Sequence, residues 1–179
     1  SFKRWGCIEP FAQTGGDASS KEGWRIAVSL LGKIYGKEVA LSIIETLGLC
    51  ESKLAKLQFT MEERGINTIK STSAGRLFDA VSAILGIRKA STFEGEASTS
   101  LQFAAEKWLD SQEEKTAEDK DFVESGVITE YREEQKEKLV KEDLYYLPTL
   151  TLVKELVERK LVGENSNQLA LHFHKGLAA

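Results

Sequence analysis

The sequence predicts an α+β fold that is mostly helical and contains one small antiparallel β element. Two observations predict it: apolar residues recur three and four positions apart in several segments, whereas a strand-like pattern occurs only between residues 127 and 142. The chain has 179 residues, of which 41% are hydrophobic and 29% charged, typical of a globular domain with its own core. Residues 1–179 are therefore treated as one unit.

The first helix is expected over residues 19–35, after a Gly-Gly turn. Ser19 and Glu22 have the spacing of a capping box, and Asp17 is an alternative N-cap. The apolar positions that follow recur at helical spacing and are Trp24, Ala27, Val28 and Leu31.

Two shorter helices are expected next, each ended by a glycine. The segment 38–49 reads as a helix that stops near Gly48. The segment 51–65 reads as another that ends at Gly65 and carries on one face Leu54, Leu57 and Met61.

Two further helices are expected in the middle of the chain. The first spans residues 73–86, ends at Gly86, and has the apolar stripe Leu77, Val81, Ile84 and Leu85. The second spans residues 93–109, begins through Gly95, and is supported by Leu101, Ala104, Ala105 and Trp108.

The composition changes between residues 106 and 143, where 14 acidic and 7 basic residues give a net charge of −7. This range is interpreted as an acidic surface insert within the domain. It could hold a small hairpin, with strands at 127–131 and 138–142.

Two helices are expected after this range. Pro148 begins one that runs to about Lys160. Asn165 or Ser166 caps the last one, in which the apolar positions Leu169, Phe173 and Leu177 repeat every four residues.

The charge balance and the motifs that are missing exclude several classes of function. The net charge of −4 and pI of about 5.4 argue against nucleic-acid binding, and no apolar run is long enough to suggest a membrane span. Cys7 and Cys50 are interpreted as thiols in a reducing, cytoplasmic compartment. No HExxH or CxxC occurs, so no metal site is expected within these residues. Because the chain begins with Ser1 instead of Met, we expect an interior piece of a longer protein.

Asp79 is an acid in an otherwise apolar helix, and its helical neighbours are all small. They are Gly75, Ser82, Ala83 and Gly86. One interpretation is a close helix–helix contact in which Asp79 pairs with Arg76 three residues earlier. The other is a ligand site, in which the two carboxylate oxygens accept hydrogen bonds from paired hydroxyls such as those of a ribose.

Gly15, Gly16 and Asp17 form the second candidate site. Paired glycines ahead of a helix can turn backbone N–H groups toward a phosphate or carboxylate, although an ordinary glycine turn with an Asp cap has the same sequence. His172 and His174 lie two positions apart on a helix and point away from each other, so they are not expected to share a metal. His174 is expected to pack between helices or to form a hydrogen bond, and not to be a ligand.

Four segments taken together resemble the HypF family of NiFe-hydrogenase maturation carbamoyltransferases. In chain order they are PFAQTGGDASSKEGWRIA, STSAGRLFDAVSAILGI, FEGEAS and LALHFHKGLA, and GRLFDA followed by FEG is the most specific part. The resemblance covers residues 10–179 and is to an interior fragment of the C-terminal, Kae1-like carbamoyltransferase region. It implies an actin/Hsp70-like (ASKHA) nucleotide-binding fold.

The resemblance also implies a function for the whole protein. Such an enzyme uses ATP and carbamoyl phosphate, forms carbamoyl-adenylate, and passes the carbamoyl group to the C-terminal Cys of a HypE-type partner, where it becomes a cyanide ligand. A metal ion, Fe or Zn, belongs to the full domain, with ligands outside this chain. The isolated piece is expected to be inactive. Alternatives are an O-carbamoyltransferase of natural-product biosynthesis and a non-catalytic module that docks a partner through residues 106–143.

By similarity to related tRNA-modifying enzymes, Asp79 and Gly95 fall on positions that hold the nucleotide ribose. The family's second ribose-binding acid corresponds to Ser100, which has a hydroxyl but no charge. The expected nucleotide-binding set is completed by Gly75, Gly15, Gly16 and Asp17. The resemblance does not extend to Gly23, because the family has Pro at this position.

Overall fold

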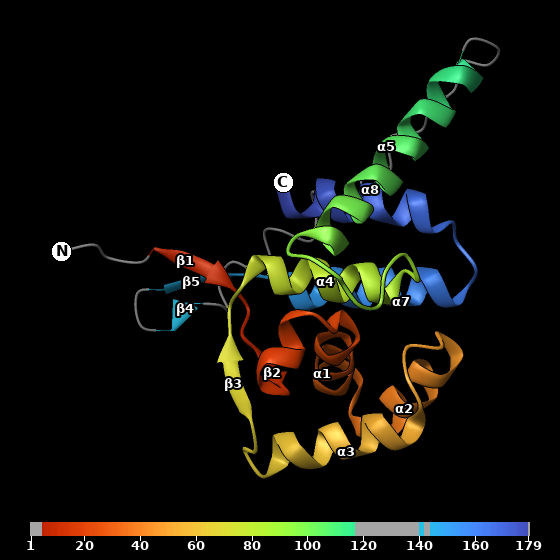
Figure 1. Ribbon diagram of the computed structural model, residues 1–179. Helices are drawn as coiled ribbons and strands as arrows, with labels where there is room; N and C mark the ends of the chain where they lie inside the picture. The colour runs from red at the N-terminus through yellow and green to blue at the C-terminus, as the bar shows by residue number, and fades with distance from the viewer. Residues whose placement is uncertain (1–4, 117–139, 142–143, 179) are drawn as a thin grey trace.

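The computed structural model describes residues 5–116, 140–141 and 144–178, and its helices are packed around a central helix, α1 (Gly23–Tyr35). α4 (Ala74–Ile84) packs against one side of α1, and α2 (Lys37–Thr46) with α3 (Ser52–Glu63) packs against another, as Figure 1 shows. Beyond α4 lie α5 (Glu96–Thr116) and α8 (Ser166–Ala178), and α7 (Thr149–Leu161) contacts both α8 and α1.

One hydrophobic core runs through these helices. The face of α1 that meets α4 is completely buried, and the apolar stripe predicted for 73–86 faces it. The fully buried side chains with the largest volumes include Phe173, Ile26, Leu30, Leu31, Ile44, Leu77, Ile84, Leu85, Leu101, Leu156 and Leu169. The predicted stripe of α4, from Leu77 to Leu85, is buried, and this explains why helical periodicity predicts this helix correctly.

The strands form two small sheets at one end of the helical body. β2 (Phe11–Thr14) pairs antiparallel with β3 (Thr68–Ser71). β5 (Leu144–Leu147) lies between β1 (Gly6–Ile8), to which it is parallel, and β4 (Val140–Lys141), to which it is antiparallel. The fold is therefore mostly helical with small antiparallel pairs, as predicted, and it also contains a parallel pair.

Several predicted boundaries change in the structure. The stops at Gly48, Gly65 and Gly86 are confirmed, since each has positive φ after a helix. The predicted start of the first helix is wrong: residues Gly16–Ser20 form a separate 3-10 turn, η1, and α1 begins only at Gly23. The capping box is wrong too, because the Ser19 hydroxyl donates to the Gly16 carbonyl (2.6 Å) instead of bonding the helix N-terminus.

The predicted hairpin and acidic insert are only partly visible. The predicted strand at 127–131 lies outside the described residues, whereas part of 138–142 forms β4. Residues 106–112 continue α5 and are exposed or half-buried. Among the helices that the structure describes, none is both long and apolar enough to cross a membrane.

Two half-buried histidines join α8 to its neighbours. Nε2 of His172 lies 2.8 Å from Oε1 of Glu155 on α7. His174 packs edge-on against the rings of Phe78 and Phe173, at centroid distances of 5.5 and 5.8 Å, so its predicted packing role is confirmed. Burial lowers the pKa of both imidazoles, against the opposing effect of Glu155 on His172 and of Glu106 on His174.

Gly23 marks the closest approach of α1 to α4. A Cβ atom added to Gly23 would lie 2.6 Å from the backbone oxygen of Asp79 and 3.1 Å from its Cβ. Because the nearest atom belongs to backbone, the contact cannot be relieved by rotating a side chain.

We therefore expect Gly23→Ala to lower the free energy of unfolding by about 1–3 kcal/mol, as overpacking does in other cores. Gly75→Ala on α4 is the matched control, since its added Cβ would meet only Ser73 Oγ, at 3.8 Å. That variant should be neutral or slightly stabilising because Ala favours helix over Gly. Urea unfolding checks both; equal midpoints for the two variants would contradict the close-packing interpretation.

The fold should also lose stability as the pH falls from 7.5 to 5.5. The pKa values of His172 and His174 are lower in the folded chain than in the unfolded one, so the unfolded chain binds more protons in this range. The stabilisation is present above the unfolded pKa and is lost as the pH drops through the folded values. Replacing both residues by Gln should flatten the pH dependence of unfolding in urea, and an unchanged slope would contradict this assignment.

Candidate functional site

The helix that carries Asp79 begins with a side-chain cap. Ser73 Oγ accepts a hydrogen bond from the backbone N–H of Arg76 at 3.4 Å, which fixes the first turn of α4. Gly75 lies in this turn, and Asp79 follows one turn later with only 6% of its surface exposed. A carboxylate buried to this extent needs a partner, because desolvation disfavours its charged form.

Arg76 is that partner. Its Nη1 lies 2.9 Å from Oδ2 of Asp79 and also donates to the backbone carbonyl of Ser20, at the end of η1. Burial raises the pKa of Asp79, and the positive charge of Arg76 opposes this shift. The guanidinium therefore links the acid on α4 to the turn that contains the Gly-Gly-Asp sequence.

The small residues beside Asp79 accommodate another helix. Ser82 and Ala83 are fully buried, and the first turn of α1 approaches Asp79 through Gly23. The structure thus confirms the predicted helix contact and the pair with Arg76. The proposed role of Asp79 toward a ribose stays a prediction.

The Gly-Gly-Asp turn has both a covered and an open part. Gly15, with φ of 112°, donates its N–H to the Asn67 carbonyl at 2.9 Å and is packed against the Arg25 side chain. Gly16 also has positive φ, but no atom lies within 4 Å of the position where its Cβ would be. Asp17 is exposed. A ligand could therefore approach this turn at Gly16 and Asp17, and less readily at the amide of Gly15.

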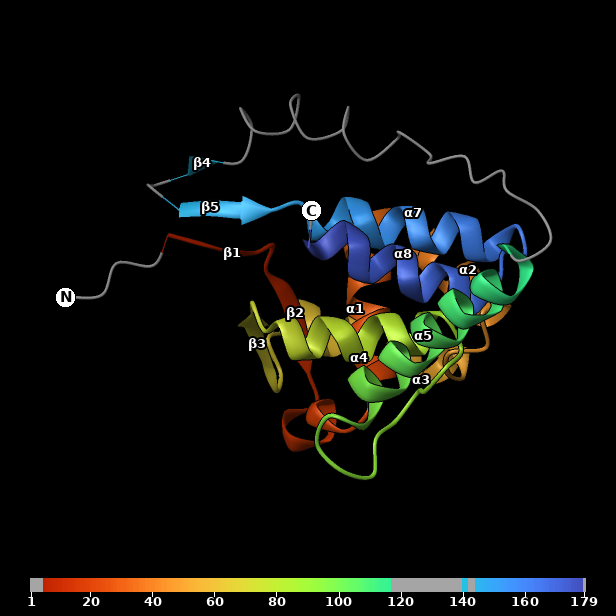
Figure 2. The ribbon, with the colours of Figure 1, turned by 90° about the horizontal axis from the view of Figure 1, so that it is seen from above.

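The loop between α4 and α5 completes the site. The backbone carbonyl of Lys89 accepts a hydrogen bond from the N–H of Trp24 at 3.0 Å, and the N–H of Ser91 donates to the backbone carbonyl of Lys21 at 2.7 Å. Figure 2 shows this loop passing beside η1 and the start of α1. It ends near Gly95, which has a φ of 82° directly before α5.

Ser100 lies farther along, in the first turns of α5, and is half-buried. The hydrogen bonds given above join η1, α4 and the loop to one another, and none of them involves Ser100. The structure therefore brings the glycine turn and the Asp79 region together and ties the loop that leads to Gly95 to the same place.

Three contacts at this site were not predicted. They are the close packing of Gly23 against Asp79, the hydrogen bond from the Arg76 guanidinium to the Ser20 carbonyl, and an ion pair at the start of α5. In that ion pair, Nη1 of Arg88 lies 2.9 Å from Oε1 of Glu96. Of these, only Gly23 had a signal in the sequence, as a glycine inside the helix predicted over residues 19–35. The contacts of Arg76 with Ser20 and of Arg88 with Glu96 depend on which segments meet in the fold. The spacing of residues along one helix does not reveal this.

The described part of the chain contains no group of three His, Cys, Asp or Glu side chains placed to hold a metal ion. The polar groups of the candidate site around Asp79 are its buried carboxylate, the guanidinium of Arg76 beside it, and backbone groups of the glycine turn and the loop before α5. Such a set can orient hydroxyl and phosphate groups by hydrogen bonding.

The chain is similar in sequence and in fold to known proteins. The sequence model of the carbamoyltransferase Kae1-like domain, second subdomain, matches residues 1–179. The probable carbamoyltransferase HypF of Methanocaldococcus jannaschii is 37% identical over 107 residues, which is 60% of this chain and 14% of that protein. Carbamoyltransferase HypF of Rhodobacter capsulatus is 35% identical over 105 residues, covering 58% of this chain and 13% of the relative. The chain thus spans a small part of these relatives.

Solved structures give the same result for the fold. A crystal structure of full-length HypF in a phosphate- and nucleotide-bound form superposes with a TM-score of 0.70 at 22% identity, covering 97% of this chain and 19% of that one. HypF of T. kodakarensis gives a TM-score of 0.68 at 20% identity, covering 98% of this chain and 21% of that one. The fold is thus that of the Kae1-like region, and the chain belongs to the HypF carbamoyltransferase family, as the second subdomain of its Kae1-like domain.

Proposed function

We propose that this chain forms part of a carbamoyltransferase that uses ATP and carbamoyl phosphate and transfers the carbamoyl group, by way of carbamoyl-adenylate, to the C-terminal Cys of a HypE-type protein. The product would serve the synthesis of a cyanide ligand in NiFe-hydrogenase maturation. Support comes from the family match over residues 1–179 and from the nucleotide-bound state of one solved HypF structure. Within this reaction, the chain's role is to position the nucleotide.

One observation supports this role: the glycine turn, helix α4 and the loop that leads to Gly95 meet. Arg76 on α4 bonds the end of η1, and the loop before α5 bonds Lys21 and Trp24 on either side of the α1 start. Residues far apart in sequence thus form one surface, with the acid on α4 next to the glycine turn. A nucleotide needs such a surface because its ribose and phosphates must be held at the same time.

Asp79 would accept hydrogen bonds from the ribose hydroxyls. Arg76 occupies Oδ2 of Asp79 and favours the ionised carboxylate, the form that has acceptor capacity on both oxygens. Since Gly75 has no side chain and its added Cβ would meet only Ser73 Oγ at 3.8 Å, the sugar could approach α4 there. Binding would then use a carboxylate whose desolvation raises its pKa and is partly opposed by the charge of Arg76 within the fold.

The remaining proposed contacts rest on exposure at the glycine turn and on the family resemblance at the start of α5. Gly16 and Asp17 offer the accessible part of the glycine turn, and Gly15 shapes the turn through its bond to Asn67. Gly95 and Ser100 would contact the sugar from the start of α5. ATP would supply the activating adenylyl group, and the metal ion of the complete domain would have its ligands outside residues 1–179.

Asp79→Asn should weaken ATP binding by the complete natural protein about 10- to 100-fold, because hydrogen bonds to a charged acceptor contribute about 1.5–3 kcal/mol each. Asn is similar in size, so the packing against Gly23 is retained. Asp110→Asn, an exposed acid on α5, is the matched control and should leave the affinity unchanged. Calorimetric titration with ATP measures both. An unaltered affinity in Asp79→Asn, with the fold intact by circular dichroism, would leave Asp79 only its packing role.

Residues 1–179 alone should not form carbamoyl-adenylate from ATP and carbamoyl phosphate. The described residues supply positioning groups and no metal-binding cluster, whereas acyl-adenylate chemistry depends on several charged groups around the phosphates. Release of pyrophosphate gives the measurement, with the complete protein as the positive control. Turnover by the isolated chain at a rate near that of the complete protein would refute this division of roles.

A further inference from the structure

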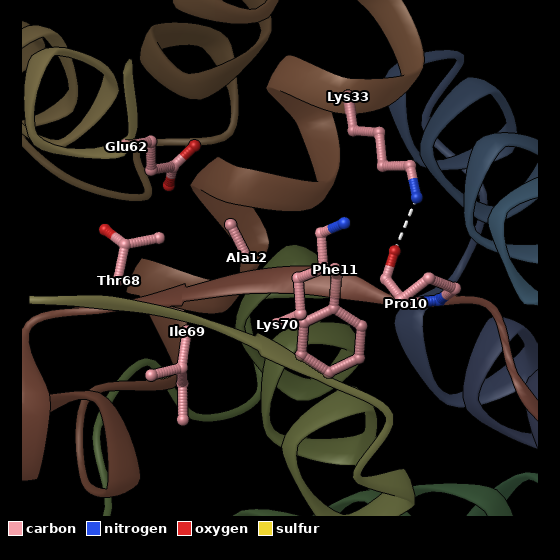
Figure 3. A pocket seen from close by; sticks show the side chains of 8 residues that line it. All are labelled: Pro10, Phe11, Ala12, Lys33, Glu62, Thr68, Ile69 and Lys70. Atoms are coloured by element: carbon pink, nitrogen blue, oxygen red, sulfur yellow. Dashed lines mark hydrogen bonds between the residues drawn. The ribbon is translucent and has the colours of Figure 1, made fainter. Parts of the chain in front are cut away.

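A pocket of about 480 Å³ lies between the β2–β3 ribbon and helices α1 and α3. It includes none of the residues assigned above to the nucleotide. Figure 3 shows that Ala12, Thr68 and Lys70 project from the ribbon toward the helices, whereas Phe11 and Ile69 project to the opposite side. The alternation of side chains along paired strands thus places polar groups on the face that lines the pocket. A volume of this order accommodates a small organic molecule.

One side of the pocket is cationic. Lys33 on α1 donates from Nζ to the backbone carbonyl of Pro10 at 2.5 Å, which fixes its ammonium group at the rim. Burial lowers the pKa of Lys33, and the charge of Lys70 lowers it further, against the effect of Glu9. Lys70 on β3 lines the same pocket, and Figure 3 shows its ammonium group on the same side of the ribbon as that of Lys33.

Neither lysine forms a direct ion pair with a carboxylate in the described parts of the chain, although the charge of Glu9 acts on Lys33 from farther away. Glu9 is engaged elsewhere, since its Oε2 accepts the N–H of Leu150 at 2.8 Å in the first turn of α7. Two positive charges that share one opening without a bound carboxylate would be stabilised by an anion between them.

The opposite side of the pocket is anionic and held in place. Oε1 of Glu62 accepts hydrogen bonds from the side chains of Thr14 and Gln58, each at 3.3 Å, and from Ser29. Thr14 and Gln58 are buried, so neutral donors orient this carboxylate, and no ion pair formed among the described residues includes Glu62. Thr14 also bonds Thr68 across the ribbon, with 3.0 Å between the hydroxyl oxygens.

We propose that this pocket binds a small two-ended ligand: an oxyanion, carboxylate or phosphate, between Lys33 and Lys70, and an ammonium or N–H donor directed at Glu62. Opposite charges on the two sides set the orientation of the ligand. The proposal is independent of the nucleotide site, because it shares none of its residues.

Three probes test the two ends separately by calorimetric titration of the full chain at low ionic strength. Phosphoethanolamine carries both groups, inorganic phosphate only the oxyanion, and ethanolamine only the ammonium. We expect phosphoethanolamine to bind more tightly than phosphate, and ethanolamine to bind weakest. A glycine titration in parallel distinguishes a carboxylate ligand from a phosphate ligand.

Substitutions at Lys70 and Glu62 test which side of the pocket binds each charged group of the ligand. Lys70→Ala should weaken phosphoethanolamine and phosphate binding by about fivefold each, as loss of one charged hydrogen-bond donor in a partly solvated site does. Glu62→Gln should weaken phosphoethanolamine binding but leave phosphate binding unchanged. Lys56→Ala, an exposed lysine on α3, is the matched charge control. Lys70 is exposed, so its replacement should not impair folding.

Absence of saturable binding by both phosphoethanolamine and glycine would overturn the proposal. Equal losses in Lys70→Ala and Lys56→Ala would do the same, because they would show a general charge effect. Asp79→Asn separates this pocket from the nucleotide site: phosphoethanolamine should bind that variant as it binds the unsubstituted chain, and a loss there would also refute the assignment.

Discussion

The contact between the start of α1 and the middle of α4 is the constraint on which the rest of the structure depends. Gly23 allows the backbone of α1 to lie against the carbonyl and Cβ of Asp79. This approach fixes where α1 enters, and so it brings the N–H of Trp24 to Lys89 and the carbonyl of Lys21 to Ser91. It also buries Asp79, which makes the charge of Arg76 necessary. The close packing at the candidate site and the pairing of Asp79 with Arg76 therefore both depend on a glycine at position 23.

The sequence predicted the helices well because their signal is local. The stripe on α4 and its stop at Gly86 are contained within one segment, and burial against α1 follows from the same residues. The strands β1, β2 and β3 were missed because each has only three or four residues and its partner lies far away in sequence. In such short strands, pairing and burial decide the conformation more than alternation does.

At the candidate site, sequence reasoning identified the unusual residue but not its surroundings. Small neighbours correctly indicated that something packs closely on Asp79, and the structure shows that a helix does so. The capping box at Ser19 failed because the hydroxyl has a nearer acceptor, the Gly16 carbonyl, inside a 3-10 turn that spacing could not distinguish from a helix start. The pocket between Lys33 and Glu62 could not be predicted at all, since four separate elements supply its lining.

The parallel pairing of Gly6–Ile8 with Tyr145–Leu147 has a consequence for the order of folding. Joining segments so distant in sequence costs loop-closure entropy before any contact repays it, whereas the contacts among α1, α2 and α3 are nearly local. The N-terminal helices can therefore assemble first. Glu9, directly after β1, caps the first turn of α7 through Leu150, so this helix gains its cap only when the distant strands have met. Sheet closure and the docking of α7 should accordingly be one late, cooperative event.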